Sequence, residues 1–130
     1  MACVERLFWV CLGSGLGGGA RYLVSLGITR LLGQSFAYGT LTVNTIGSFL
    51  IGVLMYLGVT GTALSPVLRL ALTTGVLGGF TTYSTFSYET FRYLQEGAWW
   101  TALVNVMVTL LGCLLATFLG WTLSKWLFAA

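Results

Sequence analysis

Two rows of uncharged polar side chains are the residues of this sequence best placed to do chemistry. The first row consists of Thr40, Asn44, Ser48 and Gly52. The second row consists of Thr101, Asn105, Thr109, Cys113 and Thr117. Because a four-residue repeat keeps side chains on one helix face, each row either bonds a neighbouring helix or lines a permeation path in which hydroxyl and amide groups replace an ion's water. Both interpretations stay open at this point.

The stretch from 73 to 87, TTGVLGGFTTYSTFS, is the most unusual part of the chain. Glycine in a helix interior costs about 1 kcal/mol relative to alanine, and Gly78 and Gly79 are adjacent. Serine and threonine, which follow, are favoured helix N-caps. We therefore expect one helix to end at Gly78-Gly79 and another to begin at Thr81 or Thr82. A continuous helix kinked at the glycines is the alternative.

A break of this kind would expose backbone groups that can bind ions. Its free carbonyls suit a cation, and the new helix N-terminus favours an anion. Phe80, Tyr83 and Phe86 recur every three residues beside the hydroxyls. Since aromatic ring edges carry partial positive charge, the pattern predicts that a small anion is attracted to this segment.

The elements that must position these residues are membrane helices. The chain has 130 residues, of which 57% are hydrophobic and 7% charged, whereas a soluble domain has about 25% charged residues. A span requires roughly 20 apolar residues, and the uncharged runs predict four spans at about 5–31, 37–58, 67–95 and 98–126. We expect one all-α integral-membrane domain over 1–130, surrounded by the lipid bilayer, with its third helix broken at mid-membrane depth. In the first span, Gly13 and Gly17, and likewise Gly15 and Gly19, form small-residue pairs that permit close helix packing.

The charges exclude several classes of function. There is no histidine and there are only three acidic residues, so neither a histidine triad nor paired-carboxylate chemistry is expected, and we expect no enzyme. The six basic residues are scattered singly and form no nucleic-acid patch. Arg21 lies inside the first predicted span. It either extends to the membrane interface or supplies a charge to a vestibule that concentrates anions.

The same charges give almost no orientation bias. One side of the membrane would carry Arg6, Arg69 and Lys125, and the other Arg30 and Arg92, with Arg21 near it. A lysine and arginine excess normally fixes topology. Either another feature sets the orientation, or the chain inserts both ways and provides its own antiparallel partner.

Four stretches in this order resemble the Fluc/CrcB family of fluoride channels over essentially the whole chain. They are GGGARY at 17–22, GTLTVNTIGSF at 39–49, TGVLGGFTTYSTFS at 74–87, and Asn105 with Gly112. The resemblance implies a dual-topology, antiparallel homodimer with two pores, through which toxic fluoride leaves by passive flow. It also implies a multi-pass protein of the bacterial inner (plasma) membrane.

The resemblance further implies a structural Na⁺ on the dimer axis, bound by backbone carbonyls at Gly78 and Thr81. We expect Gly78→Val to be severe, because a β-branched residue disfavours the conformations that glycine permits. In the family, the asparagine corresponding to Asn44 and the motif phenylalanines line the pores; Tyr83 departs from that motif and Phe86 retains it. The candidate fluoride pathway consists of Asn44, Tyr83, Phe86, Thr40, Ser48, Ser84, Thr85, Ser87, Thr109 and Arg21.

Two other classes remain open. A small four-helix proton-coupled exporter can also have dual topology, but it needs an acid deep in its first span. This chain has none there, and Glu89 is the one candidate. A scaffold subunit would use the same glycines and hydroxyls only for packing.

Overall fold

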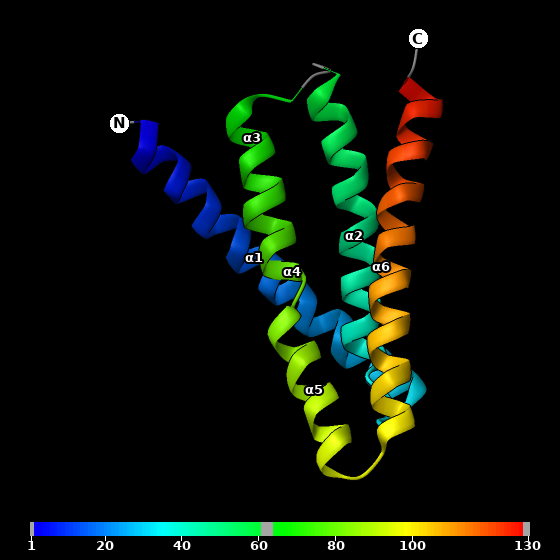
Figure 1. The fold of residues 1–130 in the computed structure, drawn as a ribbon. Coiled ribbons are helices and arrows are strands. Elements are labelled where there is room, and N and C mark those ends of the chain that lie inside the picture. The colour runs from blue at the N-terminus through cyan, green and yellow to red at the C-terminus, as the bar shows by residue number, and fades with distance from the viewer. Residues whose placement is uncertain (1, 61–63, 129–130) are drawn as a thin grey trace.

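The chain folds into four helical rods in the computed structural model, which describes residues 2–60 and 64–128 (Figure 1). Three rods are single helices: α1 (Ala2–Leu32), α2 (Tyr38–Val59) and α6 (Trp99–Phe128). The third rod is assembled from α3 (Pro66–Leu70), the π-helix η1 (Ala71–Leu77), α4 (Gly78–Phe80) and α5 (Tyr83–Gln95). The described residues contain no strand, so the predicted all-helical class is confirmed.

Local sequence explains where several helices end. Gly33, with φ of 83°, follows α1, and Gly97, with φ of 74°, follows α5; glycine adopts these left-handed conformations without steric cost. Ser65 caps α3, since its hydroxyl accepts from Leu68 N at 3.2 Å and Pro66 occupies the first turn. The helix ends lie within about one turn of the segments predicted as spans.

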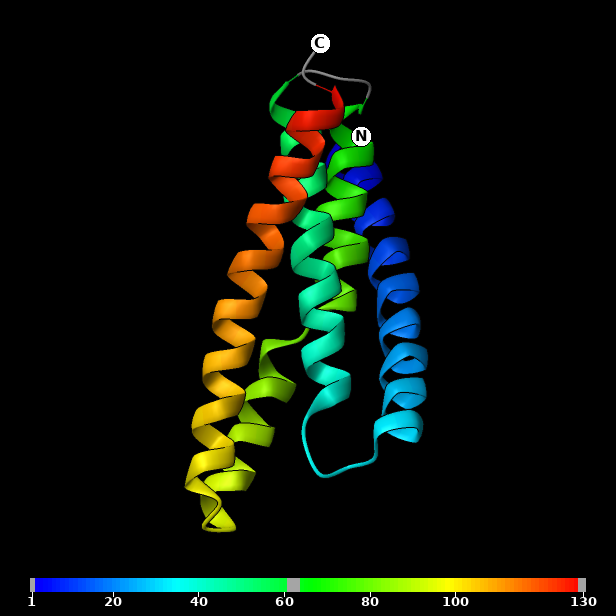
Figure 2. The same cartoon turned by 90° about the vertical axis from the view of Figure 1, so that its right-hand side faces the viewer.

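The rods are arranged with both termini at the same end of the molecule. Figure 2 shows this end at the top, while the α1–α2 and α5–α6 connections lie at the opposite end. α2 and α6 lie side by side, and α1 packs obliquely against η1 and α4 (Figures 1 and 2). The predicted connection over 58–66 is described only in part, because residues 61–63 lie outside the described residues.

Glycines allow two close helix contacts. On α1, a Cβ at Gly13 would lie 2.8 Å from the Ala71 carbonyl oxygen, and a Cβ at Gly17 would overlap the Val76 carbonyl oxygen. Gly52 and Gly120 play the same part between α2 and α6, where each faces the backbone of the other helix. The predicted packing role is therefore confirmed for Gly13 and Gly17. In the described chain, a Cβ at Gly15, Gly19 or Gly112 would meet no neighbour within 4 Å.

Many large apolar side chains lie on the outside. Leu16 is 65% exposed, Phe118 64% and Trp100 78%. Extensive exposed apolar surface marks contact with a membrane or another protein. Within the described residues, α2 and α6 are long and apolar enough to cross a membrane. The four-span arrangement stays a prediction, because Arg21 and the polar residues of α1 lower its hydropathy and the third rod is divided.

Candidate functional site

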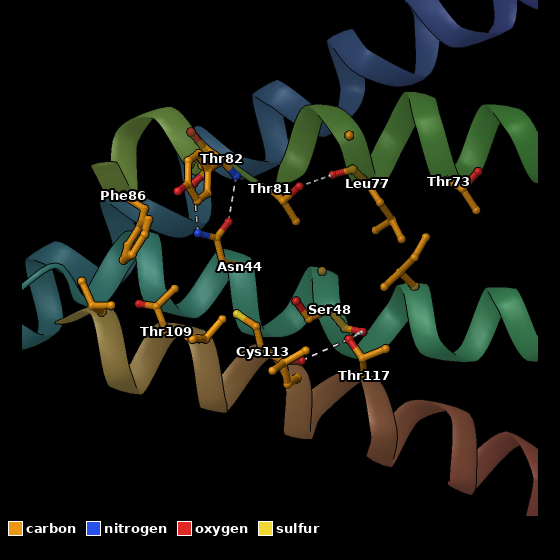
Figure 3. A pocket seen from close by; sticks show the side chains of 17 residues that line it. Asn44, Ser48, Thr73, Leu77, Thr81, Thr82, Phe86, Thr109, Cys113 and Thr117 are labelled. Carbon is orange, nitrogen blue, oxygen red and sulfur yellow. Dashed lines mark hydrogen bonds between the residues drawn. The ribbon is translucent and has the colours of Figure 1, made fainter. Parts of the chain in front are cut away.

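An open groove of about 600 Å³ lies between α2, the third rod and α6 (Figure 3). Its polar lining comes from both predicted rows and from the third rod: Asn44, Ser48, Thr73, Thr81, Thr82, Tyr83, Thr109, Cys113 and Thr117. Phe86 and aliphatic side chains complete the wall. No acidic or basic side chain lines the groove in the described part of the chain. The groove therefore offers hydrogen bonds without full charges.

The two polar rows both bond helices together and line the groove. Thr117 Oγ1 donates to the Ser48 carbonyl at 3.0 Å and joins α6 to α2. Asn105 is 1% exposed, and its Nδ2 donates to Thr90 Oγ1 at 2.9 Å between α6 and α5. Asn105 is absent from the groove lining that the structure describes. Neither helix bonding alone nor lining of a path alone therefore accounts for the two polar rows.

The third rod is interrupted at Thr81 and Thr82. Thr81 has φ −84° and ψ 160°, and Thr82 has φ −152° and ψ 113°, both in the extended region. The first helical part continues through Phe80, one residue beyond the predicted end at Gly78-Gly79, because Gly78 has helical φ −62° and ψ −37°. The second part begins at Tyr83, one residue later than the later of the two predicted starts, Thr81 and Thr82, because Thr82 is extended and serves as its N-cap.

Asn44 of α2 holds this interruption through both the oxygen and the nitrogen of its side-chain amide. Asn44 Oδ1 accepts from Thr82 N at 2.7 Å, and Asn44 Nδ2 donates to the Thr82 carbonyl at 3.0 Å (Figure 3). Both residues are buried, with Asn44 8% and Thr82 7% exposed. A buried peptide outside a helix needs such partners, so Asn44 satisfies the group that the helix leaves unpaired.

The interruption also leaves carbonyl oxygens without their helix donors, including those of Gly78 and Thr81. In a continuous helix, the Gly78 carbonyl would accept from Thr82 N, which donates instead to Asn44. The Thr81 carbonyl would accept from Thr85 N, which donates to Thr82 Oγ1 at 3.2 Å. Arg21 Nη1 on α1 donates to the Thr81 carbonyl at 3.2 Å. Gly78 and Thr81 both line the groove, so their positions suit a cation held by backbone oxygens.

Two aromatic rings stand at the groove beside the interruption. The centroids of Tyr83 and Phe86 lie 5.6 Å apart, with the ring planes tilted by 53°. Tyr83 is 80% exposed on the single chain, whereas Phe86 is half-buried. Both residues line the groove.

A second cavity of about 470 Å³ lies on the other side of the interruption. Charged side chains line it, in contrast to the groove: Arg21, Glu89 and Arg92. Thr40 and Thr85 add hydroxyl groups, and Thr82 lines both cavities. The Thr81–Thr82 peptide therefore forms part of the wall between an uncharged groove and a charged vestibule.

The structure distributes the predicted site residues over these two cavities. The groove receives Asn44, Ser48, Tyr83, Phe86, Thr109, Gly78 and Thr81. The second cavity receives Arg21, Thr40 and Thr85. Ser84 and Ser87 line neither described cavity, although Ser84 Oγ lies 3.3 Å from Thr82 Oγ1. The site prediction omitted Thr82, although threonine is a favoured N-cap and this was a signal for its role. It also omitted Cys113 and Thr117, which belong to the second polar row.

Comparison with known proteins gives a consistent result. Residues 8–121 match the family described as "CrcB-like protein, Camphor Resistance (CrcB)". A relative from Sorangium cellulosum is 48% identical over 126 residues, covering 97% of this chain and 99% of its own. A relative from Citrifermentans bemidjiense is 49% identical over 117 residues, covering 90% and 94%. One from Trichlorobacter lovleyi is 51% identical over 110 residues, covering 85% and 86%. All three are named "Fluoride-specific ion channel FluC".

Proposed function

Because this chain belongs to the CrcB family, we propose that it is a fluoride-selective channel through which fluoride leaves the cell passively. The family is one of ion channels, and the chain is a membrane protein and no enzyme. The observation that carries the proposal is the 48% identity, over 97% of this chain, to a relative named as a fluoride-specific channel. We place the chain in the bacterial inner membrane as a multi-pass protein, with α1, α2, the third rod and α6 as its four spans.

The path for fluoride would follow the groove. Fluoride holds its water tightly, so donors must replace that water without binding the ion by full charge. The Asn44 amide has two N–H donors, and one of them is used by the Thr82 carbonyl. The other N–H, the Ser48 and Thr109 hydroxyls, and the edges of Tyr83 and Phe86 supply electropositive contacts. Thr40, Thr85 and Arg21 would receive the ion in the second cavity, with Ser84 and Ser87 along α5.

An antiparallel homodimer is the assembly that we propose. The groove is open along one side, and Tyr83 at its rim is 80% exposed. Polar groups facing lipid would be costly, so a second copy that covers the groove would remove this exposure. A twofold axis generates two equivalent paths. The end that carries both termini also carries Arg6, Arg69 and Lys125, against Arg30 and Arg92 at the other end, so insertion in both orientations is consistent with the charge balance.

The carbonyls of Gly78 and Thr81 fit a structural Na⁺ at this dimer interface. Carbonyl oxygens are suitable ligands for hard cations, and both have lost the helix N–H donor that would otherwise use them. Gly78 is exposed toward the groove, and a Cβ placed there would meet only the Thr73 carbonyl oxygen, at 3.8 Å. When bound, the ion would link two interrupted rods and add positive charge beside the anion path.

One observation favours the alternative of a proton-coupled exporter. Glu89 Oε2 is buried, and in the described residues it has no hydrogen-bond partner. A carboxyl group inside a membrane protein is a typical proton carrier. However, it faces the second cavity and lies in the second half of the third rod rather than in the first span.

Fluoride efflux from proteoliposomes distinguishes these functions. The protein is reconstituted with internal KF, and external fluoride is recorded with an electrode after valinomycin is added. A channel gives rapid efflux without a proton gradient and little flux of chloride. An exporter requires the gradient and loses coupling in Glu89→Gln, whereas a scaffold gives no efflux in either condition. Absence of gradient-independent fluoride efflux from a folded protein would overturn the proposal.

A further inference from the structure

Arg21 and the interrupted rod meet at one atom, the carbonyl oxygen of Thr81. The contact joins residues 60 positions apart in the chain, with 3.2 Å between Arg21 Nη1 and the oxygen. Arg21 is the one charged residue of α1 between Arg6 and Arg30. Charged groups inside membrane helices are costly and pair with one another or with backbone carbonyls. The contact therefore gives Arg21 a defined, partly buried partner.

This carbonyl lies where the two cavities meet. Thr81 lines the groove, Arg21 lines the second cavity, and Thr82 lines both. The N–H that would fix the Thr81 oxygen in a helix belongs to Thr85, and it donates to Thr82 Oγ1 instead. Among the hydrogen bonds of the described residues, the Arg21 bond is the one that reaches this oxygen. The orientation of the carbonyl thus depends on a side chain from another helix.

We propose that Arg21 is a positioning residue that holds the Thr81 carbonyl in place to bind a monovalent cation together with Gly78. This inference rests on the cation site of the proposed function. A carbonyl oxygen has two lone pairs, so it can accept from Arg21 on one side and contact a cation on the other. The planar guanidinium presents its donors in a fixed arrangement, which suits it to orient a peptide plane.

Removal of Arg21 has two effects of opposite sign. The guanidinium charge repels a nearby cation, so loss of the charge alone would tighten Na⁺ binding. Loss of the hydrogen bond releases the Thr81 carbonyl from its orientation and would weaken Na⁺ binding. If positioning is the dominant role, the second effect exceeds the first. The sign of the change in Na⁺ affinity therefore tests the proposal.

The experiment is a Na⁺ titration of thermal unfolding on the purified full-length protein in detergent. Na⁺ replaces N-methyl-D-glucamine at constant ionic strength, and the unfolding temperature is fitted against Na⁺ concentration to give an apparent dissociation constant, which we call the Na⁺ midpoint. A ligand that binds the folded state raises stability in proportion to the logarithm of its concentration over its dissociation constant. We expect this midpoint to rise about tenfold in Arg21→Leu and about threefold in Arg21→Lys, which keeps a donor but not the fixed arrangement.

Arg30→Leu is the matched control, because it removes an exposed arginine from the last turn of the same helix. Its Na⁺ midpoint should equal that of the parent. An unchanged or lower midpoint in Arg21→Leu would overturn the proposal. If that variant does not fold, the same outcome in Arg21→Lys would do so.

Fluoride efflux separates this inference from the proposed function. A parent protein that conducts fluoride but shows no Na⁺-dependent stabilisation would overturn the role of Arg21 and the cation site, and would leave the channel function standing. If Na⁺ stabilises the parent, more weakly stabilises the Arg21 variants, and the parent conducts no fluoride, the channel function is overturned and the role of Arg21 is supported.

Discussion

Asn44 and Thr82 are joined by two reciprocal hydrogen bonds that fix the interruption of the third rod to α2. The asparagine amide accepts from the Thr82 N–H at 2.7 Å and donates to the Thr82 carbonyl at 3.0 Å. From 38 positions away, it therefore supplies the acceptor that the Thr82 N–H would have in a continuous helix, and it adds a donor to the Thr82 carbonyl. Asn44 thus acts on the backbone as well as on the groove.

Asn44→Ala should destabilise the fold and abolish fluoride efflux. The substitution leaves the Thr82 N–H buried without a partner and removes one bond to the Thr82 carbonyl, and an unsatisfied buried group costs about 1–3 kcal/mol. The thermal unfolding temperature in detergent, at saturating Na⁺, is the direct measurement. Asn44→Asp should also be destabilised, because a carboxylate accepts from Thr82 N but donates nothing to the carbonyl.

Thr109→Ala is the control for Asn44. Thr109 is buried in the same groove and is 8% exposed, but it does not contact the interruption by any hydrogen bond that the structure describes. Thr109→Ala should lower the unfolding temperature clearly less than Asn44→Ala does. Equal losses in Thr109→Ala and Asn44→Ala would show that the Asn44–Thr82 pair has no special structural role.

Thr82 should stabilise α5 through its hydroxyl. Thr82 Oγ1 accepts from Thr85 N at 3.2 Å as the helix N-cap, and loss of an N-cap costs about 0.5–2 kcal/mol. Thr82→Val keeps the shape and removes the hydroxyl, whereas Thr82→Ser keeps the hydroxyl. Thermal unfolding should rank the parent and Thr82→Ser above Thr82→Val. The reverse order would exclude the cap.

The glycines of α1 provide a matched pair for packing. Gly17→Ala places a Cβ against the Val76 carbonyl oxygen and 2.9 Å from Phe80 N, whereas Gly15→Ala places one in open space. Overpacking a close contact costs about 1–3 kcal/mol. Gly17→Ala should therefore lower the unfolding temperature and Gly15→Ala should not, and equal losses in the two variants would contradict the packing role of Gly17.

The expected severity of Gly78→Val needs a different reason from the one that the sequence offered. Gly78 has φ −62°, which any residue adopts, so its conformation does not require glycine. Its open face toward Thr73 leaves room for a side chain on the single chain. A severe effect of Gly78→Val would have to arise because the valine side chain blocks access to the Gly78 carbonyl or the approach of a second copy of the chain. Gly78→Ala should keep monomer folding and reduce Na⁺-dependent stabilisation.

The sequence predicted the four helical segments because charges and glycines bound its apolar runs. It also indicated the interruption, but it placed the end of the first helical part too early. The low helix propensity of glycine is a small effect, and the close packing of Gly79 against the Ser14 backbone outweighs it. The partners of Thr82 and Thr81 depend on contacts 38 and 60 positions apart in the chain. Which hydroxyls face the groove depends on the rotation of each helix, including the π-helical turns of η1, and no spacing rule supplies it.

The orientation of the chain should respond to a few charges. Gln34→Lys with Ser35→Lys adds positive charge to the exposed α1–α2 connection and should fix that end in the cytoplasm. If the proposed dimer is antiparallel, this variant should give no fluoride efflux alone. Val59→Lys with Thr60→Lys biases the opposite end, and co-expression of both variants should restore efflux. Full activity of either variant alone would exclude the antiparallel assembly.

Tyr83 should contribute its ring, rather than its hydroxyl, to the fluoride path. Its ring centroid lies 5.6 Å from that of Phe86, and its position at the groove rim leaves it 80% exposed on the single chain. A hydrogen bond to an ion is worth about 1.5–3 kcal/mol, while a tenfold change in rate needs about 1.4 kcal/mol. Even a partial contact between the tyrosine hydroxyl and fluoride would therefore slow its release measurably.

Tyr83→Phe should keep or raise fluoride efflux, because it removes the hydroxyl and keeps the electropositive edge. Tyr83→Ile and Phe86→Ile should both lower efflux below the parent, since they keep apolar bulk but lose the ring. All variants are compared by electrode-recorded efflux at equal protein density, with the dimer checked by size-exclusion chromatography. If Tyr83→Ile and Tyr83→Phe conduct equally, the edge at position 83 takes no part in the path and the residue serves packing alone.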